Sequence, residues 1–234
     1  MSQKAAKEKR REQGMSSEKK MMMKKFIVAG IVVLAVVGLI VAIVMTRETA
    51  GEISDKSPDP TVGKADAKVV VRVYEDFQCP ACAGVQPVLK DLIAQYSDRV
   101  KFIFNDFPLP QHKNATIAAV AAECVFGQGV DQYMAYSEML YDKQSEWELL
   151  STVKAQEKLR GYADELALEV DMTKFDSCVS DQATADKVKE DLEEGRALGV
   201  NSTPSFFVGD KKVSETPFST TLKKEIDAAL AAAQ

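Results

Sequence analysis

Cys79 and Cys82 are the residues of this chain whose type and spacing most directly imply chemistry. They flank Pro80 and Ala81, and they follow a run of mostly β-branched residues that ends at Tyr74. Two cysteines at this spacing can form a disulfide that is easily reduced. A helix that begins at the first cysteine directs free N–H groups and its positive dipole end toward that sulfur, which favours the reactive thiolate. The pattern therefore predicts thiol–disulfide exchange, with Cys79 as the nucleophile and Cys82 as the resolving thiol.

Two other interpretations of the cysteine pair are a purely structural disulfide and a zinc or copper site. A metal site of this kind usually needs a second ligand pair at close spacing. Here Cys124 and Cys178 stand alone in helical sequence, and His112 is the only histidine of the chain. We expect His112 to be a solvated loop residue. The sequence thus predicts no metal and no other cofactor.

Periodicity predicts the elements that position the cysteine pair. Residues 68–74 are typical of a buried strand, and a helix with Pro80 in its first turn is expected to continue to about Tyr96. A second strand is expected at 100–104, followed by a loop to residue 113 that contains two prolines. The cysteines would then lie where a central strand passes into a helix.

A helical block follows, and strand signals return only near the C-terminus. Asn114 is a plausible N-cap for a helix over 115–124. Further helices are predicted at 130–142, 146–159 and 183–198, strands at 205–208 and 212–214, and a last helix at 219–233. Two β regions on either side of a helical block predict one α/β sheet with a helical insertion at about 114–198.

The N-terminal part of the chain differs in charge from the rest. Residues 1–25 carry nine Lys/Arg and three Asp/Glu, a net +6, whereas the remainder has 21 basic and 32 acidic residues, a net −11. No aromatic residue lies among these basic residues, which argues against binding of nucleic acid. The basic segment directly precedes an apolar run, where positive charge sets membrane topology.

Residues 26–45 form an uncharged run whose helical length is roughly 30 Å, the thickness of a bilayer core. We expect a transmembrane anchor with residues 1–25 in the cytoplasm, a flexible tether at 46–65, and an exported domain at 66–234. A cleaved signal peptide and a buried soluble helix are the alternatives. Export would place the cysteines at the cell membrane's outer side, where disulfides persist.

Four motifs resemble the DsbA-like branch of the thioredoxin superfamily. They are residues 74–82 (YEDFQCPAC), 107–109 (FPL), 121–124 (AAEC) and 202–209 (STPSFFVG). The similarity covers about residues 66–234 and extends to membrane-tethered bacterial members. It implies a thioredoxin fold with an inserted helical domain and the oxidation of cysteine pairs in unfolded exported proteins. It also implies a recycling partner, a membrane quinone-linked thiol oxidase of the DsbB or vitamin-K-epoxide-reductase type.

Carried over by position, the resemblance assigns Cys79 as nucleophile and Cys82 as its partner. It places Thr203 and Pro204 in the loop that faces the active site, with a cis peptide bond before the proline. Some relatives also carry a second disulfide, which would here be a structural bond joining Cys124 and Cys178. Two separate buried thiols are the alternative for that pair, and an ordinary turn is the alternative for Pro204.

One position departs from the family pattern. Many relatives have an acidic residue six positions before the first cysteine, where this chain has Val73. Removal of the proton from Cys82 would then rely on water, Glu75 or another group. We expect Glu75 and Asp76 to be solvated charges at the strand end. An isomerase or reductase of the same fold, and a non-catalytic metal- or peptide-binding module, stay open as alternative functions.

Overall fold

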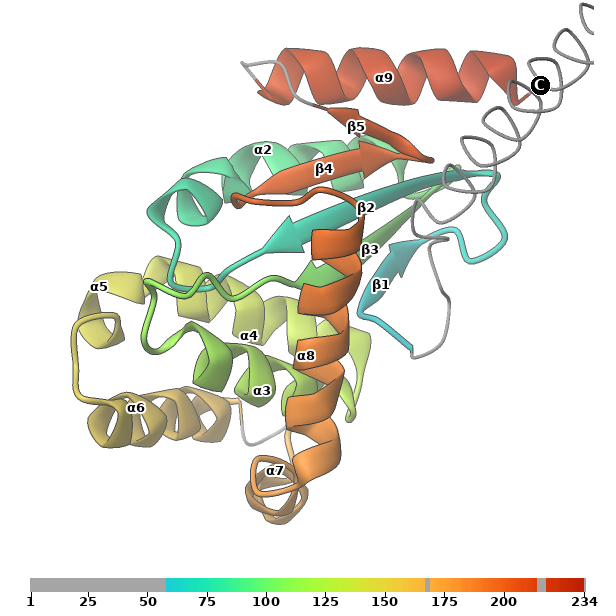
Figure 1. The fold of residues 1–234 in the computed structure, drawn as a ribbon. Helices are drawn as coiled ribbons and strands as arrows, with labels where there is room; N and C mark the ends of the chain where they lie inside the picture. Colours follow the sequence, from blue (N-terminus) through green and yellow to red (C-terminus); the bar gives the residue numbers. More distant parts are fainter. Residues whose placement is uncertain (1–57, 167–168, 214–217, 234) are drawn as a thin grey trace, which may run out of the picture. The chain divides into compact units, whose positions relative to one another are not determined.

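The structure is a computed structural model that describes residues 58–166, 169–213 and 218–233. Its centre is a five-stranded sheet with the strand order β1-β3-β2-β4-β5 (Figure 1). The strands are β1 (Thr61–Gly63), β2 (Val69–Glu75), β3 (Val100–Asp106), β4 (Ser205–Val208) and β5 (Lys211–Val213). β2 and β3 are parallel, and the other neighbouring pairs are antiparallel. The predicted α/β sheet, built from two separate β regions, is confirmed.

Alternation along β2 assigns its side chains to two different layers. Val71 and Val73 join the main core together with residues of α2 (Pro80–Tyr96) and α9 (Phe218–Ala232). On the other face, Tyr74 packs with Phe107 and Phe207 in a smaller cluster beside α8 (Gln182–Ala197). Each residue near the end of β2 therefore faces a different set of helices from its neighbour.

The helical insertion lies between β3 and β4, where the sequence predicts it (Figure 1). Before α8 it contains α3 (Ala115–Phe126), α4 (Val130–Asp142), α5 (Gln144–Trp147), α6 (Thr152–Glu165) and α7 (Met172–Cys178). A separate helix at α7 is not predicted from the sequence; its first turn is capped by the Asp171 side chain. The Cys124–Cys178 disulfide links the end of α7 to α3.

The helix predicted at 146–159 is wrong, because two helices occupy this stretch. The Asn114 side-chain amide donates to the carbonyl oxygens of Trp147, Glu148 and Leu150, which are 3.1–3.3 Å away. These carbonyls belong to the last residue of α5 and to the segment between α5 and α6. Asn114 is the N-cap residue of α3, as predicted, although its side chain makes no capping hydrogen bond.

The predicted boundary between tether and folded domain, near Asp66, is also wrong. β1 pairs with β3 inside the region predicted as tether, and the Phe104 amide donates to the Pro60 carbonyl at 2.9 Å. Asp59 is almost fully buried and forms ion pairs with Arg72 at 3.8 Å and Lys187 at 2.5 Å. These partners lie in β2 and α8, so the local sequence around Asp59 does not predict these ion pairs.

β3 also extends two residues beyond the predicted end at Phe104. Asn105 and Asp106 continue the parallel pairing with Tyr74 and Glu75 of β2. The loop that follows is correspondingly shorter than predicted.

The apolar run 26–45, like the basic segment before it, lies outside the described residues. In the part of the chain that the structure describes, no helix is both long enough and apolar enough to cross a bilayer.

Candidate active site

Cys79 is the N-cap residue of α2, directly before Pro80. The chain leaves β2 at Glu75 and turns so that the Cys79 amide donates to the Asp76 carbonyl at 2.9 Å. The amides of Cys82 and Ala83 then donate to the Cys79 carbonyl at 3.0 and 3.2 Å. Both cysteines are free thiols and both are buried. The two cysteines thus lie where the sequence predicts them, between a strand and a helix that begins at the first cysteine.

The two thiols differ strongly in acidity. The pKa of Cys79 is lowered to about 5, most of all by a hydrogen bond from the Cys82 thiol. The Thr203 side chain and the backbone N–H groups of Cys82 and Ala81 add to this effect, while burial opposes it. The helix N-terminus therefore contributes as the sequence predicts, but the neighbouring thiol contributes more. Burial in turn raises the pKa of Cys82 far above its usual range, so this thiol keeps its proton.

The loop before β4 faces the first cysteine. The Thr203–Pro204 peptide bond is cis. The Cys79 thiol donates to the Thr203 carbonyl oxygen at 3.4 Å, across a sequence separation of 124 residues. Because Pro204 has no N–H group, it cannot donate a backbone hydrogen bond to the sulfur. The structure thus brings Cys79, Cys82 and Thr203 together, as the sequence analysis proposes.

Glu75 is buried, which corrects the expectation of a solvated charge. Only 2% of it is exposed, and burial raises the pKa of its carboxyl group to about 7. Gln86 Nε2 lies 3.4 Å from Glu75 Oε2 and also 3.4 Å from the Cys82 carbonyl oxygen. The Tyr133 hydroxyl donates to Glu75 Oε1 at 3.4 Å. The Glu75 carboxyl group is therefore linked through Gln86 to the first turns of α2.

The position of Glu75 follows from strand periodicity. Residues two apart in a strand point to the same face, so Glu75 faces the same layer as Val73. The acid that many relatives place six residues before the cysteine is here four residues before it, on the same face of β2. Because β2 continues to Glu75, the side chain enters the core layer instead of solvent. This alternation was the available signal for a buried acid.

Asp76 is likewise buried, and His112 is partly buried against it. Asp76 Oδ2 lies 2.7 Å from His112 Nδ1 and accepts a hydrogen bond from the Leu109 amide at 2.8 Å. Its other oxygen accepts from the Gln78 amide at 2.7 Å. Asp76 faces away from the layer that holds Glu75, because the two residues are neighbours at the strand end. The Asp76 side chain thus holds the loop that leads to Cys79, and the Asp76 backbone hydrogen-bonds to the Cys82 sulfur.

Side-chain amides join the active-site loop to the helical insertion. Gln78 Nε2 donates to the Glu148 carbonyl at 2.8 Å, and the Asn114 amide donates to Gln78 Oε1 at 2.8 Å. Gln144 Nε2 donates to the Phe77 carbonyl at 2.7 Å. The sequence analysis did not anticipate these contacts, since they join segments that lie 36 to 70 residues apart. They fix the residue before Cys79 against the insertion.

One group of metal-compatible side chains occurs among the described residues, and it contains no cysteine. The carboxylates of Asp106, Glu123 and Asp191 lie within 4.8 Å of one another. The Lys187 ammonium lies 2.5 Å from Asp191 and from Asp59, so a positive charge is already present at this group. Cys124 and Cys178 form a disulfide in the insertion and do not belong to the candidate active site.

The sheet order and the cysteine pair at the start of α2 together define a class, the proteins with a thioredoxin fold and two cysteines in the first turn of a helix. The family model described as Thioredoxin matches residues 55–228. The chain belongs to the thioredoxin family, in its DsbA-like branch. The fold predicted from the resemblance is thereby confirmed.

Relatives of this branch match nearly the whole of their own length. The "Probable disulfide bond formation protein D" of Bacillus cereus is 31% identical over 213 residues, which cover 84% of this chain and 91% of that protein. The crystal structure of oxidised BdbD from Bacillus subtilis is 26% identical, with a TM-score of 0.60 over 74% of this chain and 93% of that one. The α-DsbA1 structure from Wolbachia pipientis shares the fold, at 20% identity and a TM-score of 0.63, over 78% of this chain and 98% of its own.

Another group of similar proteins is much longer than this chain. The Na⁺/H⁺ antiporter NhaA of Herminiimonas arsenicoxydans is 30% identical over 159 residues, which are 68% of this chain and 24% of the antiporter. The chain therefore spans about a quarter of the length of these relatives.

Proposed function

We propose that this oxidoreductase forms disulfides, transferring a Cys79–Cys82 disulfide to cysteine pairs of reduced exported proteins. The observation that carries the proposal is the difference between the thiols: the pKa of Cys79 falls to about 5, whereas Cys82 keeps its proton. A stabilised thiolate favours the reduced enzyme, which makes its disulfide a strong oxidant. The name of the Bacillus cereus relative supports the same direction of reaction.

The proposed reaction proceeds in two exchanges. A substrate thiolate attacks Cys79 Sγ, the bond to Cys82 breaks, and Cys82 Sγ takes the electron pair and then a proton. The second substrate thiolate attacks the substrate sulfur of the mixed disulfide, and Cys79 leaves as a thiolate. The substrate loses two electrons and two protons. One proton is bound by Cys82 and the other enters the solvent, because Cys79 stays ionised at neutral pH.

Glu75 is the proposed proton donor to Cys82 in the first exchange, and the acceptor when the enzyme is oxidised again. The pKa of its buried carboxyl group is raised to about 7, so both protonation states are present near neutral pH. Burial is the largest cause of the raised Cys82 pKa, and the charge of Glu75 adds to it. The carboxyl group thus takes the role that the acid two residues earlier would have in many relatives.

The proposal includes a location. Residues 1–25 would lie in the cytoplasm, residues 26–45 would span the membrane once, and residues 46–57 would connect them to the exported domain. Reoxidation would then fall to a membrane quinone-linked thiol oxidase. Proteolysis of intact cells, with any outer barrier opened, tests this topology: cleavage within 46–57 is expected, and complete protection would contradict it.

The redox potential of the cysteine pair tests the direction of the reaction. The full chain in detergent is equilibrated with glutathione buffers, alkylated and weighed by mass spectrometry. We expect a potential well above the cytosolic poise of about −220 to −260 mV. A potential below that poise would favour a reductase of the same fold. Stoichiometric bound metal, or unimpaired function after Cys79→Ser, would instead favour a non-catalytic binding module.

A further inference from the structure

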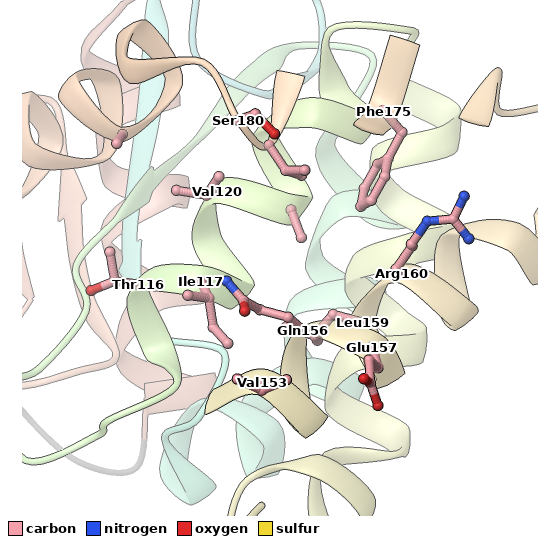
Figure 2. A pocket seen from close by; sticks show the side chains of 13 residues that line it. Thr116, Ile117, Val120, Val153, Gln156, Glu157, Leu159, Arg160, Phe175 and Ser180 are labelled. Atoms are coloured by element: carbon pink, nitrogen blue, oxygen red, sulfur yellow. The ribbon is translucent and has the colours of Figure 1, made fainter. Parts of the chain in front are cut away.

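An apolar pocket lies in the helical insertion, away from the two cysteines. Figure 2 shows α3 on one side, with Ile117 and Val120, and α6 on the other, with Val153 and Leu159. Phe175 of α7 closes a third side. Its volume of about 530 Å³ is within the range of pockets that bind ligands.

Three large apolar side chains are exposed on the described part of the chain, and two of them line this pocket. The three are Leu149 (81% exposed), Val153 (65%) and Val179 (39%). Val153 and Val179 line the pocket, and Leu149 is four residues before Val153. Scattered exposed apolar residues are ordinary in soluble proteins, whereas a rimmed group marks an interaction surface. The exposed group therefore indicates a partner that brings apolar side chains.

The segment that leads into this pocket is hydrogen-bonded to the active-site loop. The Glu148 carbonyl accepts the hydrogen bond from Gln78, the residue directly before Cys79. The next residue is Leu149, and Val153 begins a helical face of α6 that continues to Glu157 and Arg160 at the pocket. Leu149 thus lies, along the chain, between the contact with the active-site loop and the pocket.

The charged groups at the pocket do not call for a charged ligand. Arg160 donates two hydrogen bonds of 2.7 Å to the carboxylate of Asp176, so its guanidinium is already paired. The Cys124–Cys178 disulfide joins α3 to α7 beside the pocket and holds two of its walls together. A neutral, apolar side chain suits such a preformed site.

We propose that the pocket between α3, α6 and α7 binds a large apolar side chain of the unfolded protein substrate, at a distance along the chain from the cysteine that reacts with Cys79. The occupant is a reduced polypeptide with leucine, isoleucine, phenylalanine or methionine in that segment. This inference rests on the proposed function, because the substrate must first reach Cys79.

A peptide series tests the proposal on the full-length protein. Each synthetic peptide has two cysteines in an otherwise Ser/Gly/Asn sequence, and a single leucine is moved outward from the cysteines in successive members. We expect kcat/KM for peptide oxidation to rise about tenfold, or about 1.4 kcal/mol, at one range of spacings. Val153→Asp and Val179→Ser should each remove that rise. Both residues are at least partly exposed, so the fold should tolerate these changes.

Lys154→Ser is the matched control, since it changes the net charge as Val153→Asp does, at an exposed neighbouring position. It should keep the leucine-dependent rise. The rate of thiol–disulfide exchange with glutathione, which has no apolar segment, should be equal in all variants. This rate tests the proposed function separately from the pocket. Equal rates for all leucine positions, or a rise that survives both pocket variants, would overturn the proposal. So would a concentration-dependent dimer that Val153→Asp dissociates without any change in peptide rates.

Discussion

Cys79 and Cys82 lie three residues apart at the start of α2 and are free thiols, whereas Cys124 and Cys178 lie 54 residues apart and are bonded. The first pair sits where a helix N-terminus, a cis-proline loop and a buried acid meet. The second pair joins two helices of the insertion and touches none of these groups. Cysteines of one chain thus acquire opposite roles from their surroundings: acidity is adjusted at one pair, and a long loop is closed at the other.

The largest effect is expected from removing the bonded pair. Cys124→Ala with Cys178→Ala should lower the free energy of unfolding by about 4 kcal/mol, because the bond closes a loop of 54 residues. Urea denaturation measures this change. The redox potential of Cys79 and Cys82 serves as the control and should stay the same. A loss below about 1 kcal/mol would contradict the stabilising role of the bond. A shifted potential would show that the two pairs are coupled.

How much of this difference the sequence predicts depends on how far apart in the chain the contacting residues lie. The start of α2 at Pro80 is encoded locally, by the end of a β-branched strand and a proline at the first helical position. The fold and the cis-proline loop follow from motifs that resemble a known family. In contrast, β1, the buried Asp59 and the break between α5 and α6 depend on partners that are distant in the sequence.

Glu75 shows the limit most clearly. Strand alternation places it on the face of Val73, but only the packing of Tyr133 and Gln86 shows that this face is closed to solvent. A strand-end acid in an otherwise solvated position has the same local sequence. The burial of the acid, and therefore its chemistry, is a tertiary property.

Replacing the buried acid sharpens the comparison at the reactive pair. Glu75→Gln keeps the size of the side chain but removes proton transfer to Cys82. We expect the first exchange with a dithiol peptide to slow about 100-fold, as for the loss of a general acid or base. Stopped-flow measurement follows the reduction of the enzyme disulfide. Asp91→Asn is the control, because it neutralises an exposed carboxylate of α2; an equal effect of both variants would contradict a specific role of Glu75.

The second cysteine should also control the acidity of the first. Cys82→Ala removes the hydrogen bond that contributes most to the low Cys79 pKa, whereas Cys82→Ser keeps a donor. A hydrogen bond to a charged group is worth about 1.5–3 kcal/mol, so the pKa should rise by about one to two units in Cys82→Ala. The ultraviolet absorbance of the thiolate, followed against pH, gives the value. Equal pKa values in both variants would assign the effect to the helix N-terminus instead.

The smallest expected effect is a change in how steeply the redox potential of Cys79 and Cys82 falls with pH. The pKa of Cys79 is depressed to about 5 in the folded reduced enzyme, whereas a cysteine in an unfolded chain has a pKa of about 8.5. The thiolate therefore stabilises the folded reduced form fully above about pH 8.5. This stabilisation is lost as the pH falls through about 5. Below pH 5 reduction takes up two protons, and above it only one. The potential should therefore fall by about 60 mV per pH unit below that point and by about 30 mV above it.

Measuring the slope in the Glu75→Gln background removes the carboxyl group that titrates near pH 7. A constant slope of about 60 mV per pH unit up to pH 8 would mean that Cys79 stays protonated. The free pair would then differ from the bonded pair only in being reduced, and the contrast in acidity between the two sites would be lost.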